Sequence, residues 1–362
     1  MVPGLLMRAT PSTASATSGS TLEVLLATLL AVSVILIFWS QQRYPALLKK
    51  FHAGTAIKVG GPISFDALLK VTPDMSTETR VLRTSINWLY TNRFGMYFAL
   101  PFGATLMTLL ASTGAPKQLS STAGNVLCGV ITGAPLGVCT NCATPVAQSL
   151  LVSGASARLT VAVMISSPSF NPVVVAMVFM LFPLPLAALR IIVPTLLLLG
   201  LPVLVPENRL TVQVGTPAIS PTILRRLLGF LKTFFRNLLR LTLLTLPWML
   251  LAAFLGALTV ELIPAYGTHL PISVFGVIGV AILGTLVPVP MALDVALAYT
   301  LYRTGTPASY VAALLCTLAP VSIYSLSALG QQLGGRCSLR LAVATAFLGS
   351  VAGIALLSFR SP

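Results

Sequence analysis

The chain has 362 residues, of which 56% are hydrophobic and only 8% are charged. An average soluble domain carries roughly a quarter of its residues as charges, so this chain has too few to cover a water-soluble surface of its size. Long apolar stretches recur along most of its length. The composition therefore excludes a soluble enzyme or DNA-binding domain and predicts an all-α, polytopic membrane protein.

The charged residues are unbalanced, with 22 Lys and Arg against 7 Asp and Glu and a formal net charge of +15. The basic residues cluster between apolar stretches, which is typical of loops on the cytoplasmic face of a membrane. We therefore expect the lipid bilayer and a small-molecule or ion substrate as partners, with self-association left open. We expect no nucleic acid, no cofactor and no bound metal ion.

The N-terminal part of the chain predicts one helix that stands apart from the rest. Residues 1–20 are rich in Ser and Thr and predict a disordered extension. Residues 21–40 contain an apolar run that is long enough to cross a bilayer and too long for a signal-peptide core. The polar residues Ser40–Arg43 follow it as a stop-transfer flank would. We predict a retained first transmembrane helix, with a signal anchor as the alternative.

The remainder divides into two similar parts, each introduced by a basic amphipathic segment. We predict a basic cytoplasmic loop at 41–93, a first repeat at 94–205, a basic cytoplasmic linker at 206–240 and a second repeat at 241–362. Four apolar spans in each repeat, together with the first helix, give roughly nine spans. This count places both basic segments on the cytoplasmic side of a bacterial inner membrane.

Glycine and proline positions support the duplication. Gly133 and Gly154 are each followed by a glycine 151 residues later, at Gly284 and Gly305, and a proline interrupts the first span of each part. Duplicated bundles around a central path are the common plan of secondary transporters. The span count makes the two repeats parallel. A re-entrant segment in either copy would change that, and this alternative stays open.

The first part has two breaks that are rich in polar residues, one from Pro135 to Pro145 and one from Ser166 to Pro172. A continuous lipid-facing helix has no reason to accept such residues, whereas a broken helix that lines a cavity can. The alternative is a proline kink packed on small neighbours. We predict that the breaks form half of a substrate site near the membrane midplane, with these residues: Cys139, Asn141, Cys142, Thr144, Pro145, Ser166, Ser167, Pro168 and Asn171.

Asp294 is the one carboxylate well inside a predicted span, and it follows a similar proline-rich break in the second part. Polar and ionisable residues within a membrane are expensive and usually functional. We favour a role in coupling transport to protons or cations, or in pairing with a cationic substrate. The alternative is a salt bridge with Arg190 or Arg303.

Cys139 and Cys142 form a Cys-x-x-Cys pair, which in soluble folds marks a redox motif or half of a zinc site. This chain has no second such pair and only two histidines. Thiols that face a cavity can bind a soft, thiophilic solute, whereas thiols at a helix interface can simply allow close packing. The sequence leaves both interpretations open.

The residues of these breaks resemble the predicted-permease family that includes the ArsP organoarsenical permeases and the YraQ-like proteins. In that family a turn with proline and cysteine is followed by a glycine turn and a Ser-Pro-x-x-Asn-Pro break, matched here by Cys139, Cys142, Pro145, Gly154, Ser167, Pro168, Asn171 and Pro172. The resemblance covers residues 94–357 and implies two units of four to five spans, each with a broken helix. Family members place the cysteines one residue apart, so organoarsenical specificity is not transferred to this chain.

We therefore predict a permease, not an enzyme, that moves a small solute through a midplane site between two broken-helix repeats. Two readings from other classes remain. One is a membrane thiol-redox or metal-handling protein that uses Cys139 and Cys142. The other is a structural subunit that transports nothing.

Overall fold

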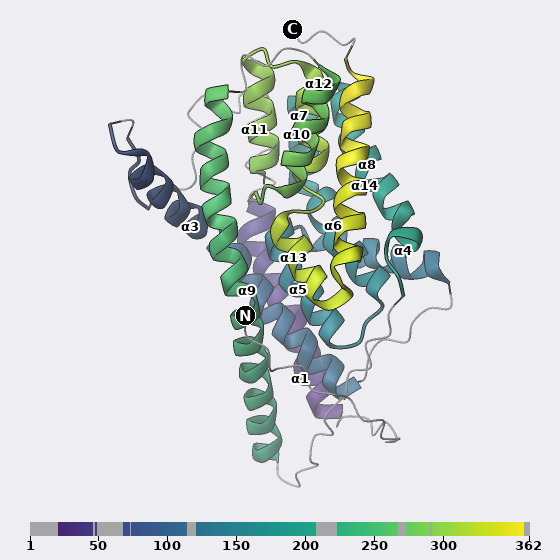
Figure 1. Cartoon of the computed structure of the whole chain (residues 1–362). Helices are drawn as coiled ribbons and strands as arrows, with labels where there is room; N and C mark the ends of the chain where they lie inside the picture. The colour runs from purple at the N-terminus through teal and green to yellow at the C-terminus, as the bar shows by residue number, and fades with distance from the viewer. Residues whose placement is uncertain are drawn as a thin grey trace.

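The structure is a computed structural model that describes residues 21–45, 48, 68–72, 74–113, 121–207, 223–266, 273–289 and 292–357. The expected N-terminal extension at 1–20 lies outside these residues, as do large parts of both basic connections. In the described part every regular element is a helix (Figure 1), which confirms the all-α class. The elements are α1 (Thr21–Phe38), η1 (Trp39–Arg43), α3 (Thr77–Thr113), α4 (Thr122–Gly133), η3 (Ala134–Leu136), α5 (Thr140–Val152), α6 (Ala157–Ser169), α7 (Pro172–Leu181), α8 (Leu184–Leu204), α9 (Ile223–Tyr266), α10 (Val274–Leu286), α11 (Leu293–Arg303), α12 (Ala308–Thr317), α13 (Ile323–Leu333) and α14 (Gly335–Ala355).

The outer surface of the bundle is apolar, the reverse of a soluble protein. Leu199, Val203 and Phe275 are 70%, 82% and 87% exposed. Four helices are long and apolar enough to cross a bilayer, namely α1 with η1, α8, α9 and α14, and α6 with α7 makes a fifth span that is bent by 43°. The molecule is a polytopic membrane protein. The described helices do not confirm the predicted count of nine spans.

The chain turns back between α4 and α5 instead of crossing the bilayer. These helices are about 18–20 Å long, too short for a hydrocarbon core of about 30 Å. α4 runs parallel to α6, because Gly129 packs against Leu159 and Gly133 packs against Val163. α5 is joined to α6 by a tight turn and runs antiparallel to it. α4, η3 and α5 therefore form a re-entrant hairpin, and counting them as one full span is wrong.

The second part shows the same reversal. α10 runs parallel to α12, since Gly276 packs against Tyr310 and Gly284 packs against Thr317. α11 is joined to α12 by a short turn and runs antiparallel to it. The tip of this second hairpin lies at 287–292, of which residues 290 and 291 are outside the described part. The re-entrant alternative therefore holds in both parts.

Each hairpin is followed by a pair of helices that continue in one direction around a break. α6 and α7 are bent by 43° at 170–171. α14 runs antiparallel to α12, because Gly349 packs on Thr317 and Gly353 packs on Ser309, and α14 follows α13 after one residue. α12 and α13 therefore point the same way, with their break at 318–322.

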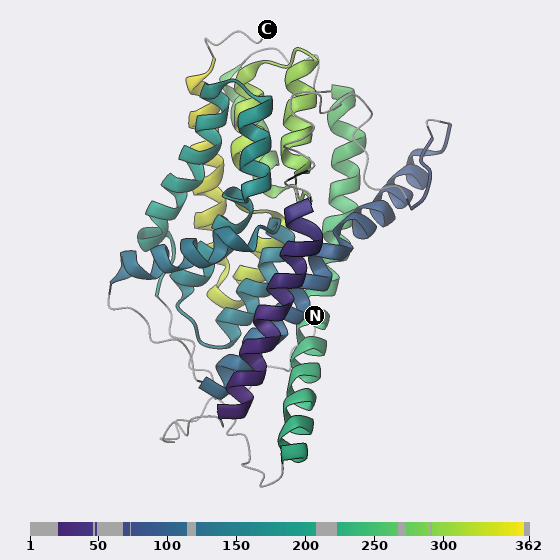
Figure 2. The same ribbon diagram turned by 180° about the vertical axis from the view of Figure 1, so that it is seen from behind.

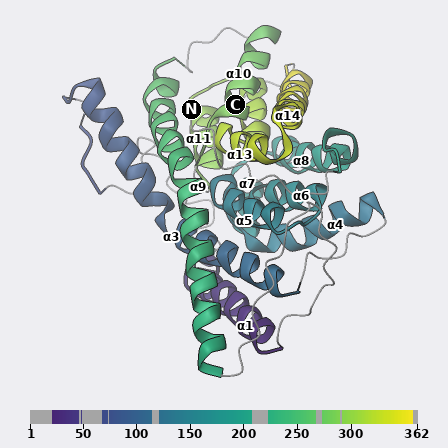
Figure 3. The same cartoon turned by 60° about the horizontal axis from the view of Figure 1, so that its bottom comes forward.

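The long helices α3 and α9 pack against each other in opposite directions. Residue numbers rise along one helix as they fall along the other in three contacts: Trp88 with Gly256, Gly103 with Leu241, and Thr108 with Asn237. Figures 1 and 3 show α9 along one side of the bundle, crossed by α3, whose N-terminal half projects away from the other helices.

This antiparallel packing argues against two predictions. If the two parts are copies, their first helices run in opposite directions, so the copies would be inverted and not parallel. The described starts of α3 and α9 lie toward opposite ends of the helix pair, which does not favour a shared side of the membrane for the basic residues there. Both predictions counted each hairpin as a full span.

The helices of the two parts correspond at a constant interval. α6, α7 and α8 begin at residues 157, 172 and 184, and α12, α13 and α14 each begin 151 residues later, at 308, 323 and 335. Gly154 and Gly305 occupy matching turns, both with φ of 85°. The two parts thus share the same order of elements, and the same spacing from the end of α5 onward.

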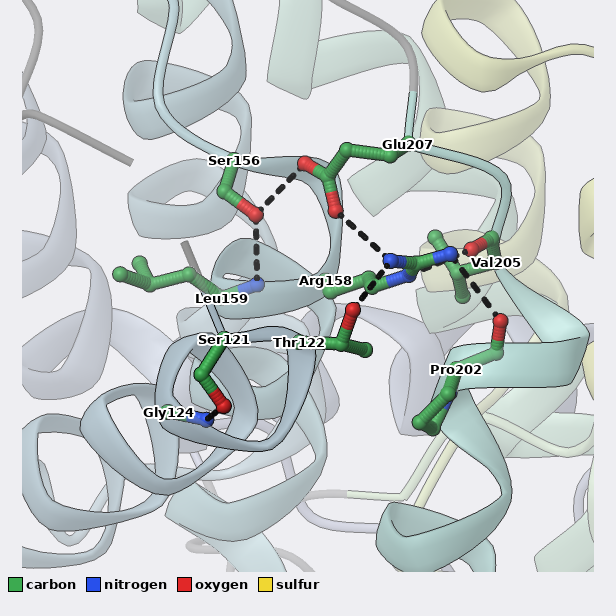
Figure 4. A network of polar contacts seen from close by, with 9 residues as sticks. All are labelled: Ser121, Thr122, Gly124, Ser156, Arg158, Leu159, Pro202, Val205 and Glu207. Carbon is green, nitrogen blue, oxygen red and sulfur yellow. Dashed lines mark hydrogen bonds and ion pairs between the residues drawn. The ribbon is translucent and has the colours of Figure 1, made fainter. Parts of the chain in front are cut away.

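A network of polar contacts pins the outer end of the first hairpin (Figure 4). Arg158 at the start of α6 contacts the Val205 carbonyl at 3.1 Å, the Pro202 carbonyl at 3.1 Å, the Thr122 hydroxyl at 3.0 Å and the Glu207 carboxylate at 3.5 Å. Ser156 caps α6 and donates a 2.7 Å hydrogen bond to the same carboxylate. The start of α4, the start of α6 and the end of α8 are joined there.

Candidate functional site

The four breaks meet around one small cavity. Its lining comes from the two hairpin tips, the α6–α7 break and the α12–α13 break: Val138, Cys139, Thr140, Pro168, Asn171, Val174, Val289, Ala292, Asp294, Leu318 and Ala319. The space within it is about the size of one water molecule. A larger solute therefore fits only if the surrounding breaks move apart.

Asn171 and Ser167 hold the tip of the first hairpin in place. The Asn171 amide donates a 2.8 Å hydrogen bond to the Gly137 carbonyl, and its oxygen accepts one of 3.0 Å from the Val173 N–H. The Ser167 hydroxyl accepts a 3.2 Å hydrogen bond from the Val138 N–H. Gly137 has φ of 59°, which glycine adopts without a steric penalty. Backbone groups freed by the breaks are thus bonded within the bundle.

Two side chains of α5 tie the first hairpin to the second part. The Thr140 hydroxyl donates to the Ala319 carbonyl in the α12–α13 break. The Asn141 amide donates a 3.2 Å hydrogen bond to the Val289 carbonyl in the second hairpin tip. The Asn141 oxygen is buried and has no hydrogen-bond partner among the described residues. Such an atom marks a place where a polar ligand or water binds.

Two helices that start at the cavity have no side-chain cap. α5 begins after Cys139 and α11 begins after Ala292, and neither side chain accepts a hydrogen bond from the first turn. The first backbone N–H groups of an uncapped helix carry a partial positive charge. Ala292 has φ of 65°, the one positive value at a non-glycine residue in the described part. This conformation costs about 1–2 kcal/mol, and such strain gathers at functional sites.

Asp294, in the first turn of α11, forms a buried ion pair with Arg190 of α8. Arg190 Nη2 lies 3.0 Å from Asp294 Oδ2, and the two side chains are 1% and 6% exposed. Nε and Nη1 of Arg190 have no hydrogen-bond partner in the described part of the chain. The salt-bridge alternative for Asp294 is therefore present, with Arg190 and not Arg303 as the partner, and the same carboxylate lines the cavity.

Cys139 and Cys142 lie together beside a buried arginine. Their sulfur atoms are 3.2 Å apart and both are free thiols. Cys139 lines the cavity, whereas Cys142 faces Gly95 of α3. Arg43 of η1 interacts electrostatically with both sulfurs, and Asn92 accepts a 3.8 Å contact from the Cys139 thiol. The described residues hold no cluster of three or more His, Cys, Asp or Glu that could bind a metal ion.

The first helix supplies Arg43 and also touches the hairpin tip. Trp39 Nε1 donates a 2.8 Å hydrogen bond to the Pro135 carbonyl. The Arg43 guanidinium lies 4.4 Å over the ring of Phe38, which stacks on Phe98 with ring centres 4.1 Å apart. Figure 2 shows α1 along the bundle with its C-terminal end at mid-height. Arg43 is therefore buried against the site and is not part of a solvated stop-transfer flank.

The structure brings some of the predicted site residues to the cavity. Four line it directly: Cys139, Pro168, Asn171 and Asp294. Three others do not line the cavity but contact residues that do: Asn141, Cys142 and Ser167.

Three predicted residues make other contacts. The Thr144 hydroxyl bonds back to the Thr140 carbonyl at 2.7 Å. Pro145 lies within α5, with its carbonyl near Gly103 of α3, and the Ser166 hydroxyl lies 3.4 Å from the carbonyl of Gly129. These residues shape helix packing and do not line the cavity.

Apart from Asp294, sequence reasoning missed the lining that the second part contributes. Val289, Ala292, Leu318 and Ala319 are apolar or small and carry no chemical signal of their own. The 151-residue interval could have located them, because adding 151 to the residue numbers of the first-part breaks gives these positions. Nothing in the local sequence of Arg43 marks it as a neighbour of the thiols.

The chain thus defines a class of architecture: a helical membrane protein in which two re-entrant hairpins and two broken helices meet at one cavity. It is similar to the UPF0718 protein YraQ of Escherichia coli (strain K12), with 30% identity over 210 residues. That alignment covers 55% of this chain and 58% of YraQ, so it spans little more than half of the relative's length. No family model matches the chain, and no solved structure matches it. This comparison supports the resemblance to YraQ-like proteins. The resemblance to the ArsP permeases rests on the sequence motif alone.

Proposed function

We propose that this protein is a membrane permease that moves a small solute through the central cavity. The observation that carries the proposal is the meeting of four helix breaks at one small, partly polar cavity inside an apolar bundle. Irregular backbone is tolerated within a membrane where it is buried in protein or lines a cavity. Transporters place their substrate and coupling-ion sites at such breaks.

The two parts, at 77–204 and 223–355, act in this proposal as inverted internal repeats. The 151-residue interval between matching helices and the antiparallel pairing of α3 and α9 support this assignment. Inverted repeats can rock against each other and so expose a fixed midplane site to one side at a time. We propose the bacterial inner membrane as its location, because its spans are helical and the relative to which it is similar comes from a bacterium.

Closure of the site would depend on contacts that cross between the repeats. The hydrogen bonds from Thr140 to Ala319 and from Asn141 to Val289 join the first hairpin to the second repeat beside the cavity. Separation of the tips breaks these bonds and frees their polar groups for the solute. The unpartnered oxygen of Asn141 is already available for that purpose.

The proposed solute site comprises Cys139, Asn141, Cys142, Pro168 and Asn171, with Asp294 coupling transport to a proton or cation. Cys139 and Cys142 favour a thiophilic solute, such as a metalloid or soft metal species, because thiolate ligands bind soft ions well. The 3.2 Å spacing of the two sulfurs allows both to contact one atom of such a solute.

Flux measurements in proteoliposomes test the permease proposal. The purified full chain is reconstituted, and uptake of trivalent organoarsenicals, soft metal ions and small oxyanions is compared with that of empty vesicles. We expect flux of at least one solute, and its loss in Ala319→Trp, which fills the cavity. Val343→Trp, on the exposed face of α14, is the matched control and should keep the flux.

The same assay separates the roles of the thiols and the carboxylate. Loss of flux in Cys139→Ser/Cys142→Ser, with no loss in the control Cys337→Ser, would establish a thiol-dependent path. Flux that survives the double substitution but is lost in Asp294→Asn would show that transport depends on the Asp294 carboxylate and not on the thiols. Absence of flux for every solute in the panel, from protein that is folded by size-exclusion chromatography, would reject the permease.

A thiol-redox function is the second candidate, and the 3.2 Å distance between Cys139 and Cys142 sulfurs favours it. In that reaction the dithiol would give two electrons and two protons to a disulfide of a partner protein, which becomes a dithiol as the Cys139–Cys142 bond forms. Mass spectrometry after alkylation would detect this disulfide. Its formation by exchange with a disulfide donor, in protein that shows no flux, would favour this candidate over the permease.

A further inference from the structure

We propose that Arg190 binds a negatively charged group of the transported solute, and that Asp294 is the exchangeable counter-ion that releases Arg190 when it takes up a proton. This inference rests on the proposed permease function. It adds the charge of the substrate and the residue that recognises it.

Arg190 has more hydrogen-bonding capacity than its surroundings use. A guanidinium carries five N–H donors, and the hydrogen bond found for it in the described part is the 3.0 Å bond from Nη2 to Asp294. The buried Cys316 thiol also interacts electrostatically with Arg190. Nε and Nη1 have no partner among the described residues, although the side chain is 1% exposed. Arginine commonly binds a carboxylate or phosphate through two parallel N–H···O hydrogen bonds. The single contact with Asp294 therefore leaves donors for a second anion.

The surroundings of the pair favour negative charge. Asp294 lines the cavity, and α5 and α11 present uncapped N-termini there. A helix N-terminus attracts anions through its free N–H groups and its dipole. Asp294 is the one carboxylic acid among the lining residues of the described part. Once it is protonated, the guanidinium behind it and the two helix ends at the cavity have no compensating negative charge.

The ion pair joins the two parts, since Arg190 lies in the first part and Asp294 in the second, and the matching pair of positions carries no charge. At the 151-residue interval, the position of Arg190 corresponds to Leu341 and that of Asp294 to Ala143, and both are 0% exposed. The same architecture is therefore built there from apolar residues. A buried ion pair gives little net stability over well-packed apolar side chains, so packing alone does not explain why Arg190 and Asp294 are charged where the matching positions are apolar.

The exchange needs no covalent step. With Asp294 ionised, Arg190 is neutralised and the cavity rejects a second anion. A proton from the open aqueous side converts Asp294 to the carboxylic acid, its bond to Nη2 weakens, and the anionic group of the solute bonds to the guanidinium. Release of both on the other side moves one proton together with one negative charge and restores the ion pair.

Anion binding to the purified full chain in detergent tests the inference directly. The probes are sodium sulfate, phosphate and acetate, each compared with chloride at equal ionic strength, in acidic and alkaline buffer. The readout is the shift in thermal unfolding temperature with anion concentration, which gives an apparent Kd. Arg190→Leu/Asp294→Ala introduces the residues of the matching positions, Leu341 and Ala143, and should fold normally. Arg158→Gln removes an arginine outside the cavity and is the matched control.

We expect at least one oxyanion to stabilise the wild type, more strongly in acidic buffer. Asp294→Asn imitates the protonated acid and should bind that anion at least about tenfold more tightly in alkaline buffer than the wild type does. The double variant should fold and show no anion-specific shift, while Arg158→Gln behaves as the wild type. Anion binding that persists in the double variant, or no anion that distinguishes it from the wild type, would overturn the inference.

Flux assays then distinguish this inference from the permease proposal. Binding that depends on Arg190 in protein that moves no solute would reject the permease and keep the anion site. Flux of a solute that is unchanged in Arg190→Leu/Asp294→Ala would keep the permease and overturn the anion site.

Discussion

The Asn171 side chain forms hydrogen bonds with the backbone and also lines the cavity. Its amide nitrogen satisfies the Gly137 carbonyl at the tip of the first hairpin, while its oxygen caps α7. A buried amide needs several partners, and here they come from two different segments. The residue therefore fixes the position of the tip relative to the break.

Replacement of Asn171 should lower the stability of the fold by an amount that depends on which of its two hydrogen bonds are lost. Asn171→Ala loses both bonds and should cost about 1–3 kcal/mol. Asn171→Ser keeps a good helix cap but is too short to reach Gly137, so its loss should be smaller. Thermal unfolding in detergent measures both variants. An alanine variant as stable as the wild type would contradict this role.

Glycines let the re-entrant hairpins pack closely on the broken helices. A Cβ atom at Gly133 would lie 2.7 Å from the Val163 carbonyl oxygen, and it would also meet the Ser166 hydroxyl. The same contact recurs 151 residues later between Gly284 and Thr317. Small residues at such positions are the usual means by which membrane helices approach each other.

Gly133→Ala should therefore push α4 from α6 and lower stability by about 1–3 kcal/mol, since backbone atoms cannot move aside as a side chain can. Gly229→Ala is the matched control, because its Cβ would meet nothing within 4 Å on exposed α9. That change should stabilise by about 0.5–1 kcal/mol through helix propensity. Equal stability of the two variants would argue against close packing at Gly133.

The antiparallel pairing of α3 and α9 predicts a specific cross-link. Thr108 and Asn237 side chains are 3.0 Å apart, so Thr108→Cys/Asn237→Cys should form a disulfide on mild oxidation in membranes. A parallel pairing aligned on Pro101 and Pro247 would instead bring Thr108 to Phe254. Thr108→Cys/Phe254→Cys is thus the control pair, and mass spectrometry should find no cross-link in it.

Helical class and the positions of the breaks could be predicted because apolar runs, prolines and buried polar residues are local signals. The direction of the chain after each break could not. Two half-length helices around Pro135–Pro145 have the same composition as one broken span, and only the contacts of Gly129 and Gly133 with α6 show that α4 and α5 form a hairpin. Arg43 escaped notice for the same reason, since its partners are about a hundred residues away.

The two halves share a plan but differ in their charges. Arg43 of η1 lies beside the two thiols of α5, and Arg190 of the first part pairs with Asp294 of the second. Leu341 and Ala143 occupy the positions that match the ion pair. Two sets of helices with the same order and spacing therefore carry different charged groups.

Labelling from outside the membrane tests the inverted arrangement. Glu78, before the first half, and Lys232, before the second, are both exposed and lie at opposite ends of the α3–α9 pair. In a Cys128→Ser background, Glu78→Cys and Lys232→Cys should react with a membrane-impermeant maleimide from opposite sides of the bilayer. Reaction of both from the same side would restore the parallel arrangement.

The opposite directions of α3 and α9 also bear on how the chain enters the bilayer during synthesis. Basic residues stand near the beginning of both helices, so the preference of positive charge for the cytoplasm pulls the two halves toward conflicting orientations. The helices that leave the ribosome first, α1 and α3, would settle that conflict before α9 is made. The charges that flank α1 and α3 should then determine the orientation of the whole chain. The basic residues before α9 should end up on whichever side of the membrane that orientation requires.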